Sequence, residues 1–153
     1  MWSTSNPNYR ELIAEKLAKN HFSQALGFEM TSVSPGRTEG RIVLAQQHQQ
    51  QNGFVHGGVV LTLCDIVAGF AAFTLVDPTE HVVTAEIKVS CLRPGVGESL
   101  RAVGYVIKPG KHIHFCESEI YALHQGEEKL IAKSSSSMAV VRQKGYAASS
   151  KNA

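Results

Sequence analysis

The sequence predicts an α+β domain in which one long helix is cradled by a curved sheet of six antiparallel strands. Three observations support this prediction. An apolar run, long enough for about 30 Å of helix, extends over Gly57–Val76. From His81 onward, apolar and polar residues alternate with period two, as in β-strands. Two shorter segments of strand character precede the apolar run.

Length and composition favour one globular domain. The chain has 153 residues, of which 43% are hydrophobic and 18% charged, enough to form a core without metal or disulfide staples. We expect a lead and helix over residues 1–25, the main domain over 26–142 and a polar tail over 143–153. The net charge of +2 is too small to imply a nucleic-acid partner.

Two further features bear on location. The three cysteines are odd in number and widely spaced, so neither a disulfide framework nor a Cys-x-x-Cys site is indicated. The first residues contain no basic segment leading into an apolar core, so we expect no signal peptide. Both observations favour a protein of the reducing cytoplasm.

The N-terminal third combines helix and hairpin. We expect Met1–Asn8 to be disordered. Apolar residues then recur at helical spacing over Tyr9–Phe22, which predicts a half-buried helix. Two short strands follow, Phe28–Val33 and Thr38–Ala45, and the Pro and Gly between them favour a tight turn. We therefore expect a hairpin.

The polar run Gln46–Asn52 is either a linker or the loop of a site, because it directly precedes the apolar helix. The helix itself has the length of a membrane span. Asp65 near its middle and the absence of flanking basic residues argue against that interpretation. A helix that is apolar on nearly every face is typical of a protein core.

The second half of the chain reads as four long strands separated by short turns, which predicts an antiparallel meander. The serine run Ser134–Ser137 is unusual for a strand, and we expect it at a solvent-facing or edge position. The four strands are Val82–Leu92, Ser99–Lys108, His112–His124 and Lys129–Val141.

The start of the apolar helix has the chemistry of an anion site. Gly57 and Gly58 carry backbone N–H groups that have no acceptor within the helix, and the helix dipole adds partial positive charge. Such an end can bind an anion or a developing oxyanion. His56 would donate a hydrogen bond or fix the loop. The alternative is a helix start that merely needs flexible residues.

Asp65 is the single charge in the apolar helix. A carboxylate in such surroundings is paired, protonated or catalytic, and a structural hydrogen-bonding role is the alternative to a functional one. The His-Gly-Gly sequence that begins nine residues earlier favours function. A carboxylate withdrawn from water is a stronger base or nucleophile than one in water.

These residues and several later ones carry a family resemblance. The residues in question are Gln50, Asn52-Gly53, His56-Gly57-Gly58 and Asp65, followed by Thr84, Arg93-Pro94 and Lys108-Pro109-Gly110-Lys111. Over Gly27–Val141 the chain resembles the hotdog-fold acyl-CoA thioesterases, and the PaaI-like subgroup in particular. The resemblance implies a long helix wrapped by a six-stranded sheet. It also implies a homodimer whose sheets join edge to edge, with two active sites at the interface, and tetramers are common in such families.

The resemblance also implies roles for single residues. The Gly57 N–H would polarise the thioester carbonyl, and Asp65 of the partner subunit would attack as nucleophile or activate water. Gln50 matches a position that orients the water or the thioester. Thr84 matches a position near the attacking water. Gly69 stands where many members carry Ser or Thr, so no hydroxyl can assist from there.

Further residues are candidates for substrate contact. Arg93, Lys108 and Lys111 suit the phosphates of coenzyme A, although ordinary solvated turns explain them as well. The resemblance leads us to expect Gly58, Asn52, Thr84 and Gly69 near the substrate too. Three aromatic residues would line an acyl pocket or belong to the core; these are Phe54, Phe70 and Phe73.

No metal or cofactor is expected. His112 and His114 have a spacing found in some metal sites, but no Cys or carboxylate completes a set by spacing. The chain also lacks the Gly-x-Ser-x-Gly, Walker and dinucleotide-binding motifs.

The sequence therefore predicts a homo-oligomeric acyl-CoA thioesterase that acts on aryl- or fatty-acyl-CoA without a membrane or nucleic-acid partner. Two alternatives remain: a hydratase or dehydratase on the same fold, and a non-catalytic acyl-CoA sensor. Asp65 favours chemistry, because a pure binder gains nothing evident from a buried charge. Gly57 and Asp65 are about 12 Å apart along one helix, too far to meet on one carbonyl. This distance is the reason for expecting a dimer.

Overall fold

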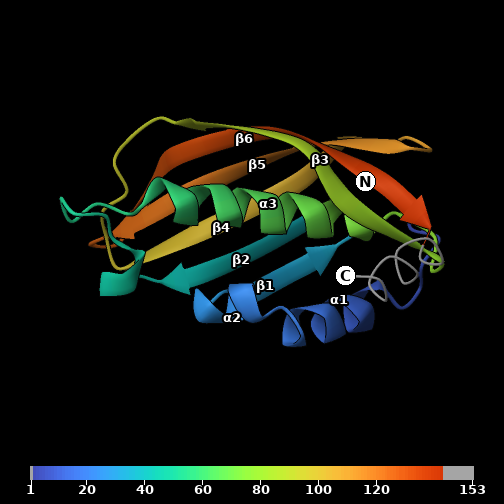
Figure 1. Ribbon diagram of the computed structural model, residues 1–153, viewed down its shortest axis with the longest axis horizontal. Coiled ribbons are helices and arrows are strands. Elements are labelled where there is room, and N and C mark those ends of the chain that lie inside the picture. Colours follow the sequence, from blue (N-terminus) through green and yellow to red (C-terminus); the bar gives the residue numbers. More distant parts are fainter. Residues whose placement is uncertain (1, 143–153) are drawn as a thin grey trace, which may run out of the picture.

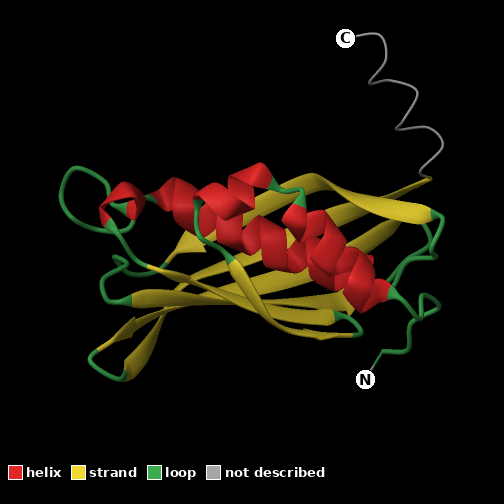
Figure 2. Cartoon of the chain, turned by 90° about the horizontal axis from the view of Figure 1, so that it is seen from below, coloured by secondary structure: helices red, strands yellow, loops and turns green. Residues whose placement is uncertain are grey.

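The protein consists of one long helix lying across one face of a six-stranded antiparallel sheet, with two short helices beside it (Figure 1). The computed structural model describes residues 2–142, so the predicted polar tail 143–153 lies outside the described residues. The long helix is α3 (Gly57–Phe73), and the short ones are α1 (Tyr9–Ala18) and α2 (His21–Ala25). Seen along the sheet, the helices form one layer and the curved strands the other (Figure 2). The predicted α+β architecture is confirmed.

The sheet has the strand order β1-β2-β4-β5-β6-β3. Only β4, β5 and β6 form a meander, whereas β3 pairs with β6 at the far edge. The prediction of a four-strand meander was wrong at β3, because α3 carries the chain across the sheet before β3 begins. The strands are β1 (Glu29–Ser34), β2 (Arg37–Val43), β3 (Glu80–Cys91), β4 (Ser99–Lys108), β5 (Ile113–His124) and β6 (Glu127–Arg142).

A row of small residues crosses four strands beneath α3. The register pairs Thr38 with Gly104, Gly104 with Ser118, and Ser118 with Ser134. A side chain added at Gly104 would collide with the backbone of Val67, so the helix lies close to the sheet at this point. The row therefore sets the depth at which α3 is seated.

Hydroxyl groups of the same row hold the helix backbone. Thr38 Oγ1 donates to the carbonyl oxygen of Val67 at 2.7 Å, and Ser118 Oγ donates to that of Cys64 at 3.1 Å. Ser134 and Ser136 are buried, and β6 lies between β5 and β3. The prediction that the serine run is solvent-facing or at an edge was therefore wrong for these two residues, because the helix covers this strand.

The helix predicted over Tyr9–Phe22 is interrupted. The Asn20 side chain accepts a hydrogen bond from the Ser23 N–H at 3.0 Å and so caps a second helix, α2. Tyr9 and Ile13 of α1 are buried against Phe73 at the end of α3. The N-terminal helices therefore share a hydrophobic cluster with α3.

Residues before α1 are ordered by specific contacts. The Trp2 indole N–H donates to the Val106 carbonyl oxygen at 3.1 Å, and the Thr4 hydroxyl donates to the Thr74 carbonyl oxygen. Asn6 is only 1% exposed. The prediction of a disordered lead was therefore wrong for residues 2–8, since these side chains find partners on β4 and at the end of α3.

Thr74 joins the end of α3 to the first hairpin. It is fully buried, and its Oγ1 donates to the Ala71 carbonyl oxygen at 2.7 Å and accepts from the Gly36 N–H at 2.6 Å. Thr74→Val has nearly the same shape but leaves the Gly36 N–H without a partner. We expect it to lower the free energy of unfolding by about 1–3 kcal/mol in urea denaturation. Thr74→Ser should retain most of the stability, and equal losses in both variants would contradict this role.

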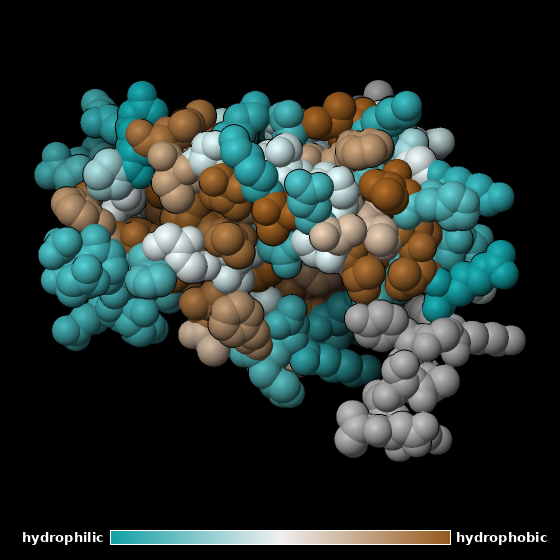
Figure 3. All heavy atoms as spheres, turned by 45° about the horizontal axis from the view of Figure 1, so that its top comes forward, coloured by the Kyte–Doolittle hydropathy of each residue, from teal (hydrophilic) through white to brown (hydrophobic). Residues whose placement is uncertain are grey.

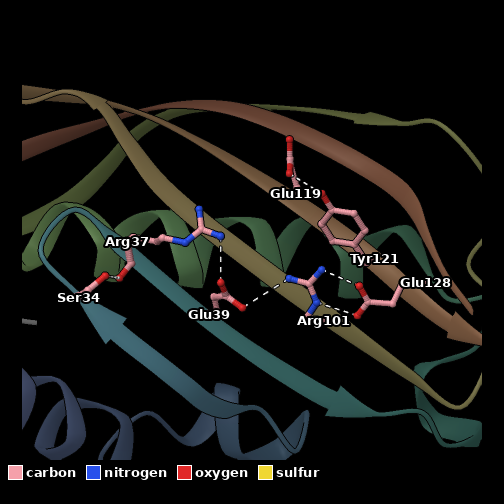
Figure 4. A network of polar contacts seen from close by, with 7 residues as sticks. All are labelled: Ser34, Arg37, Glu39, Arg101, Glu119, Tyr121 and Glu128. Carbon is pink, nitrogen blue, oxygen red and sulfur yellow. Dashed lines mark hydrogen bonds and ion pairs between the residues drawn. The ribbon is translucent and has the colours of Figure 1, made fainter. Parts of the chain in front are cut away.

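Charged side chains form a network on the sheet face away from α3 (Figure 4). Arg101 lies between Glu128 at 2.7 Å and Glu39 at 3.5 Å, and Arg37 pairs with Glu39 at 2.9 Å. Such partly exposed pairs contribute little stability each, but they make the middle of this face polar. Exposed apolar side chains, among them Val43 and Phe115, lie elsewhere on the face. Among the described residues, no helix has the length and apolar character that crossing a membrane requires.

Candidate active site

The start of α3 is fixed by the residue that precedes it. His56 is the N-cap, and its ring nitrogen Nδ1 accepts a hydrogen bond from the Gly58 N–H at 2.8 Å. The His56 carbonyl oxygen accepts from the Val59 N–H at 3.0 Å. His56 therefore acts as a hydrogen-bond acceptor that positions the loop, and the Gly58 N–H is already used within the protein.

The neighbouring Gly57 N–H, unlike the Gly58 N–H, is not used in a hydrogen bond among the described residues. Within residues 2–142 it makes no hydrogen bond to another protein atom, and space beyond Gly57 is open: an added Cβ would meet nothing within 4 Å. The helix dipole also places partial positive charge at this end. The chain thus presents one free donor at the N-terminus of its longest helix.

Gln50 lies in a tight turn beside this donor. Its backbone N–H donates to the Phe54 carbonyl oxygen at 2.8 Å, and its side-chain oxygen accepts from the Asn52 N–H. The amide nitrogen of the Gln50 side chain remains as a donor. Asn52 is exposed at the tip of the turn and contributes only its backbone. Of the two interpretations of Gln46–Asn52, the plain linker is wrong, because the segment is a structured loop held by hydrogen bonds.

A cavity of about 420 Å³, named here the Gly57 cavity, opens in front of the helix start. Its lining residues include Gln50 and Gly57 at the helix start, Cys91 at the end of β3 and Arg93 just beyond it. Arg93 also donates to the Leu130 carbonyl oxygen at 2.9 Å, which holds its guanidinium at the rim. Phe54 is another lining residue and is 40% exposed.

Asp65 lies in a second cavity, of about 280 Å³, named here the Asp65 cavity. The carboxylate is half-buried and accepts a hydrogen bond at 2.6 Å from Thr84 Oγ1 on β3. The prediction of a carboxylate enclosed among apolar side chains was therefore wrong for the single chain, because Asp65 sits on the cavity side of α3. One lone pair is engaged by Thr84, which leaves the rest of the carboxylate facing the cavity.

Gly69, one helical turn after Asp65, forms part of the same cavity wall. A Cβ added there would meet nothing within 4 Å, so the glycine keeps the cavity open along the helix. Phe70 and Phe73 continue the wall. Phe73 is only 2% exposed and belongs to a core cluster, so the prediction of a core residue is confirmed for it, while its role in an acyl pocket stays a prediction.

The two cavities share no lining residue in the single chain. Gly57 and Asp65 are eight residues apart on α3, a span of about 12 Å. The Gly57 donor and the Asp65 carboxylate of a single chain therefore cannot both reach one carbonyl group. The single chain holds the two groups in separate cavities.

The three basic residues expected to contact CoA phosphates lie at opposite ends of α3. Arg93 lies at the Gly57 cavity, whereas Lys108 ends β4 and Lys111 lies in the following turn, beyond the C-terminal end of α3. The spacing of His112 and His114 would place them on one face of a strand, but His112 is exposed and precedes β5, whereas His114 is buried on β5. Within the described residues, no group of three or more His, Cys, Asp or Glu side chains has the geometry of a metal site.

Comparison with known proteins shows which family this chain belongs to. The sequence pattern of the Thioesterase superfamily matches residues 52–129, more than half of the chain. The chain belongs to this superfamily. The matched segment begins two residues after Gln50 and includes Gly57, Asp65 and Thr84.

Individual members of the superfamily agree with this assignment. A thioesterase family protein from Silicibacter pomeroyi superposes with a TM-score of 0.86 and 31% identity over 88% of this chain and 98% of its own. A putative esterase of Saccharolobus solfataricus is 28% identical over 78% of this chain and 82% of its own length. Human acyl-coenzyme A thioesterase 13 is 25% identical over 81% of this chain and 88% of its own length. The predicted hotdog fold is confirmed.

Three features of the Asp65 cavity were not predicted. The hydrogen bond between Thr84 and Asp65 joins a strand and a helix whose packing no local pattern reveals. Asn20 and His81 line the Asp65 cavity, although the sequence around them carries no catalytic motif. Asn20 reaches this cavity because the N-terminal helices lie beside α3, whereas His81 belongs to β3 (Figure 1).

Proposed function

We propose that the protein is a homodimeric acyl-CoA thioesterase of the PaaI-like subgroup, which hydrolyses aryl- or fatty-acyl-CoA to a free acid and CoA. The superfamily match and the name of the human relative support the reaction class. The division of the site between two cavities carries the proposal, because each cavity supplies what the other lacks.

The free edge of β3 provides the means to join the cavities. β3 has 12 residues and lies at the edge of the sheet, and an unpaired edge is a template for another strand. Pairing two β3 strands about a two-fold axis makes them antiparallel, so each strand start lies opposite the partner's strand end. His81 and Thr84, in the first half of β3, line the Asp65 cavity, and Cys91 at its end lines the Gly57 cavity. The pairing therefore brings each Asp65 cavity to a Gly57 cavity of the partner.

The surface along this edge fits such an interface. With the top of Figure 1 turned forward, apolar side chains form a broken band across the middle of the molecule, between hydrophilic groups at both ends (Figure 3). Thr84 and Ala85 at the middle of β3 are exposed in the single chain. A partner strand would cover them and shield Asp65 from bulk water.

The chemistry then follows from the two halves. The Gly57 N–H polarises the thioester carbonyl, and Asp65 of the partner subunit attacks the carbonyl carbon or removes a proton from water. Thr84 holds the carboxylate, and the Gln50 amide nitrogen orients the water or the thioester. The carbon–sulfur bond breaks, water supplies the new oxygen, and CoA leaves as the thiol. Arg93 at the rim suits a CoA phosphate, and the pairing brings the end that carries Lys108 and Lys111 toward the partner's cavity.

The test is release of free thiol from a panel of aryl- and fatty-acyl-CoA esters, with oligomeric state measured by light scattering. We expect turnover by a dimer or a tetramer built from dimers, with no added metal. Binding without turnover across the panel would favour an acyl-CoA sensor, and hydration of an enoyl-CoA would favour a hydratase. Location in the cytoplasm stays a prediction.

A further inference from the structure

His48 is a buried histidine that the proposed mechanism does not use. Its side chain is only 2% exposed, and it ends the short 3-10 helix Gln46–His48 in the loop before α3. Both ring nitrogens have hydrogen-bond partners. Nδ1 accepts from the Ala45 N–H at 3.0 Å, and Nε2 lies 3.1 Å from the Leu26 carbonyl oxygen. The ring is therefore held in one orientation by two backbone groups.

These two contacts fix the tautomer of His48. A nitrogen that accepts from a backbone N–H carries no proton, and a carbonyl oxygen can only accept a hydrogen bond. Nδ1 is therefore unprotonated, and the Nε2–H donates to the Leu26 carbonyl oxygen. The neutral imidazole thus links the loop before α3 to a residue 22 positions earlier in the chain.

Leu26 is a fixed point for this link. It is the C-cap of α2, and its side chain packs against the core cluster that includes Leu63 of α3. Residues 45–56 are named here the site loop. Among the described residues, only one other hydrogen bond ties the site loop to a part of the chain outside α3, from the Val55 N–H to the Gly95 carbonyl oxygen at 3.0 Å. The His48 ring therefore supplies one of the two anchors of the site loop.

The backbone of His48 transmits this anchor to the start of α3. Its carbonyl oxygen accepts from the His56 N–H at 2.8 Å. His56 directly precedes Gly57, and its φ of −64° and ψ of 136° set the direction of the Gly57 N–H, because the peptide group between the two residues is planar. A shift of His48 would therefore turn the peptide group that holds the free donor.

We propose that His48 is a positioning residue, whose imidazole anchors the site loop to Leu26 and thereby orients the Gly57 N–H toward the thioester carbonyl. This inference rests on the proposed hydrolysis of acyl-CoA, in which that N–H is the donor. A catalytic group must lie within about 0.5 Å of its productive position, and a misplacement of about 1 Å can cost about a hundredfold in rate. His48 lines neither the Gly57 cavity nor the Asp65 cavity, so it acts through the backbone that it holds.

Two substitutions separate the two ring contacts. His48→Gln has an amide nitrogen near the position of Nε2 and keeps a donor for Leu26. His48→Asn has an oxygen near the position of Nδ1, so it keeps the acceptor for Ala45 and loses the anchor. We expect His48→Asn to lower kcat for thiol release by about tenfold to a hundredfold with KM little changed, as for a misplaced transition-state donor. His48→Gln should restore kcat to within about threefold of the wild type.

A double-mutant cycle with Gly57→Pro tests the route of this effect. Gly57→Pro removes the N–H that His48 orients, so His48→Asn should lower the residual kcat of that variant by less than about threefold. Thr74→Val is the control for lost stability, because it removes a buried hydrogen bond at the other end of α3 and lines neither cavity. At a temperature where all variants are folded, its kcat should stay within about twofold of the wild type.

The outcomes separate this inference from the proposed function. In an active enzyme, equal losses from His48→Asn with and without the Gly57 N–H would overturn the positioning role alone, and so would an unchanged kcat in His48→Asn. Nitrogen-15 NMR of the wild type should show the His48 proton on Nε2, and a proton on Nδ1 would contradict the anchor. Absence of turnover in the wild type for every acyl-CoA ester would overturn the proposed function and the role of His48 together.

Discussion

Asp65→Asn is expected to lower kcat for acyl-CoA hydrolysis by at least about a hundredfold, with fold and oligomer retained. The amide has nearly the same shape as the carboxylate, and its oxygen can still accept from Thr84 Oγ1, which lies 2.6 Å from Asp65 in the wild type. The variant loses only the negative charge and the basicity that attack or proton removal needs. Thiol release under saturating substrate measures kcat directly.

The control for this change is Asp77→Asn, which applies the same chemistry to an exposed aspartate after α3. Asp77 accepts hydrogen bonds from Thr79 in its own turn and lines neither proposed half-site. It should leave kcat unchanged, and circular dichroism of both variants should match the wild type. A near-normal kcat in Asp65→Asn would remove Asp65 from the mechanism.

Local patterns predicted the elements of the fold well, because period-two alternation and Gly-containing turns are signals within a few residues. The strand predicted over Ser99–Lys108 has the observed bounds, and the long helix begins at Gly57 as predicted. The errors concern placement. β3 lies beside β6 because α3 crosses the sheet, and residues 2–8 are ordered by contacts with Val106 and Thr74. Both depend on residues far apart in the chain.

The candidate site likewise has features that local sequence patterns predict and features that depend on distant residues. The sequence singled out Gly57, because the N–H at a helix start has no helical acceptor and glycine leaves it accessible, and Asp65, because an apolar helix rarely carries a charge. It did not reveal that Asp65 faces a cavity or that Thr84 is its hydrogen-bond partner. The roles of these residues, and of Gln50 and His56, stay predictions that only activity can test.

Gly57→Pro offers the sharpest test of the free donor. Gly57 is the first residue of α3, where proline is favoured because its missing N–H has no helical acceptor. His56 has φ −64° and ψ 136°, a conformation that a following proline permits. We expect the variant to fold and to lose about a hundredfold to a thousandfold in kcat, as when one oxyanion donor is removed. Gly57→Ala keeps the N–H, and its Cβ enters open space, so its loss of kcat should be much smaller.

Combining Gly57→Pro with Asp65→Asn in one dimer then tests whether the site is shared. Chains with different affinity tags are co-expressed, and the heterodimer carrying one change in each chain is purified. If Gly57 of one protomer works with Asp65 of the other, one of the two sites is intact and the other has both defects. The heterodimer should therefore recover about half of the wild-type activity, although each homodimer is nearly inactive. If donor and carboxylate served the same protomer, both sites would be damaged and no activity would return, which would overturn the shared site and the dimeric mechanism with it.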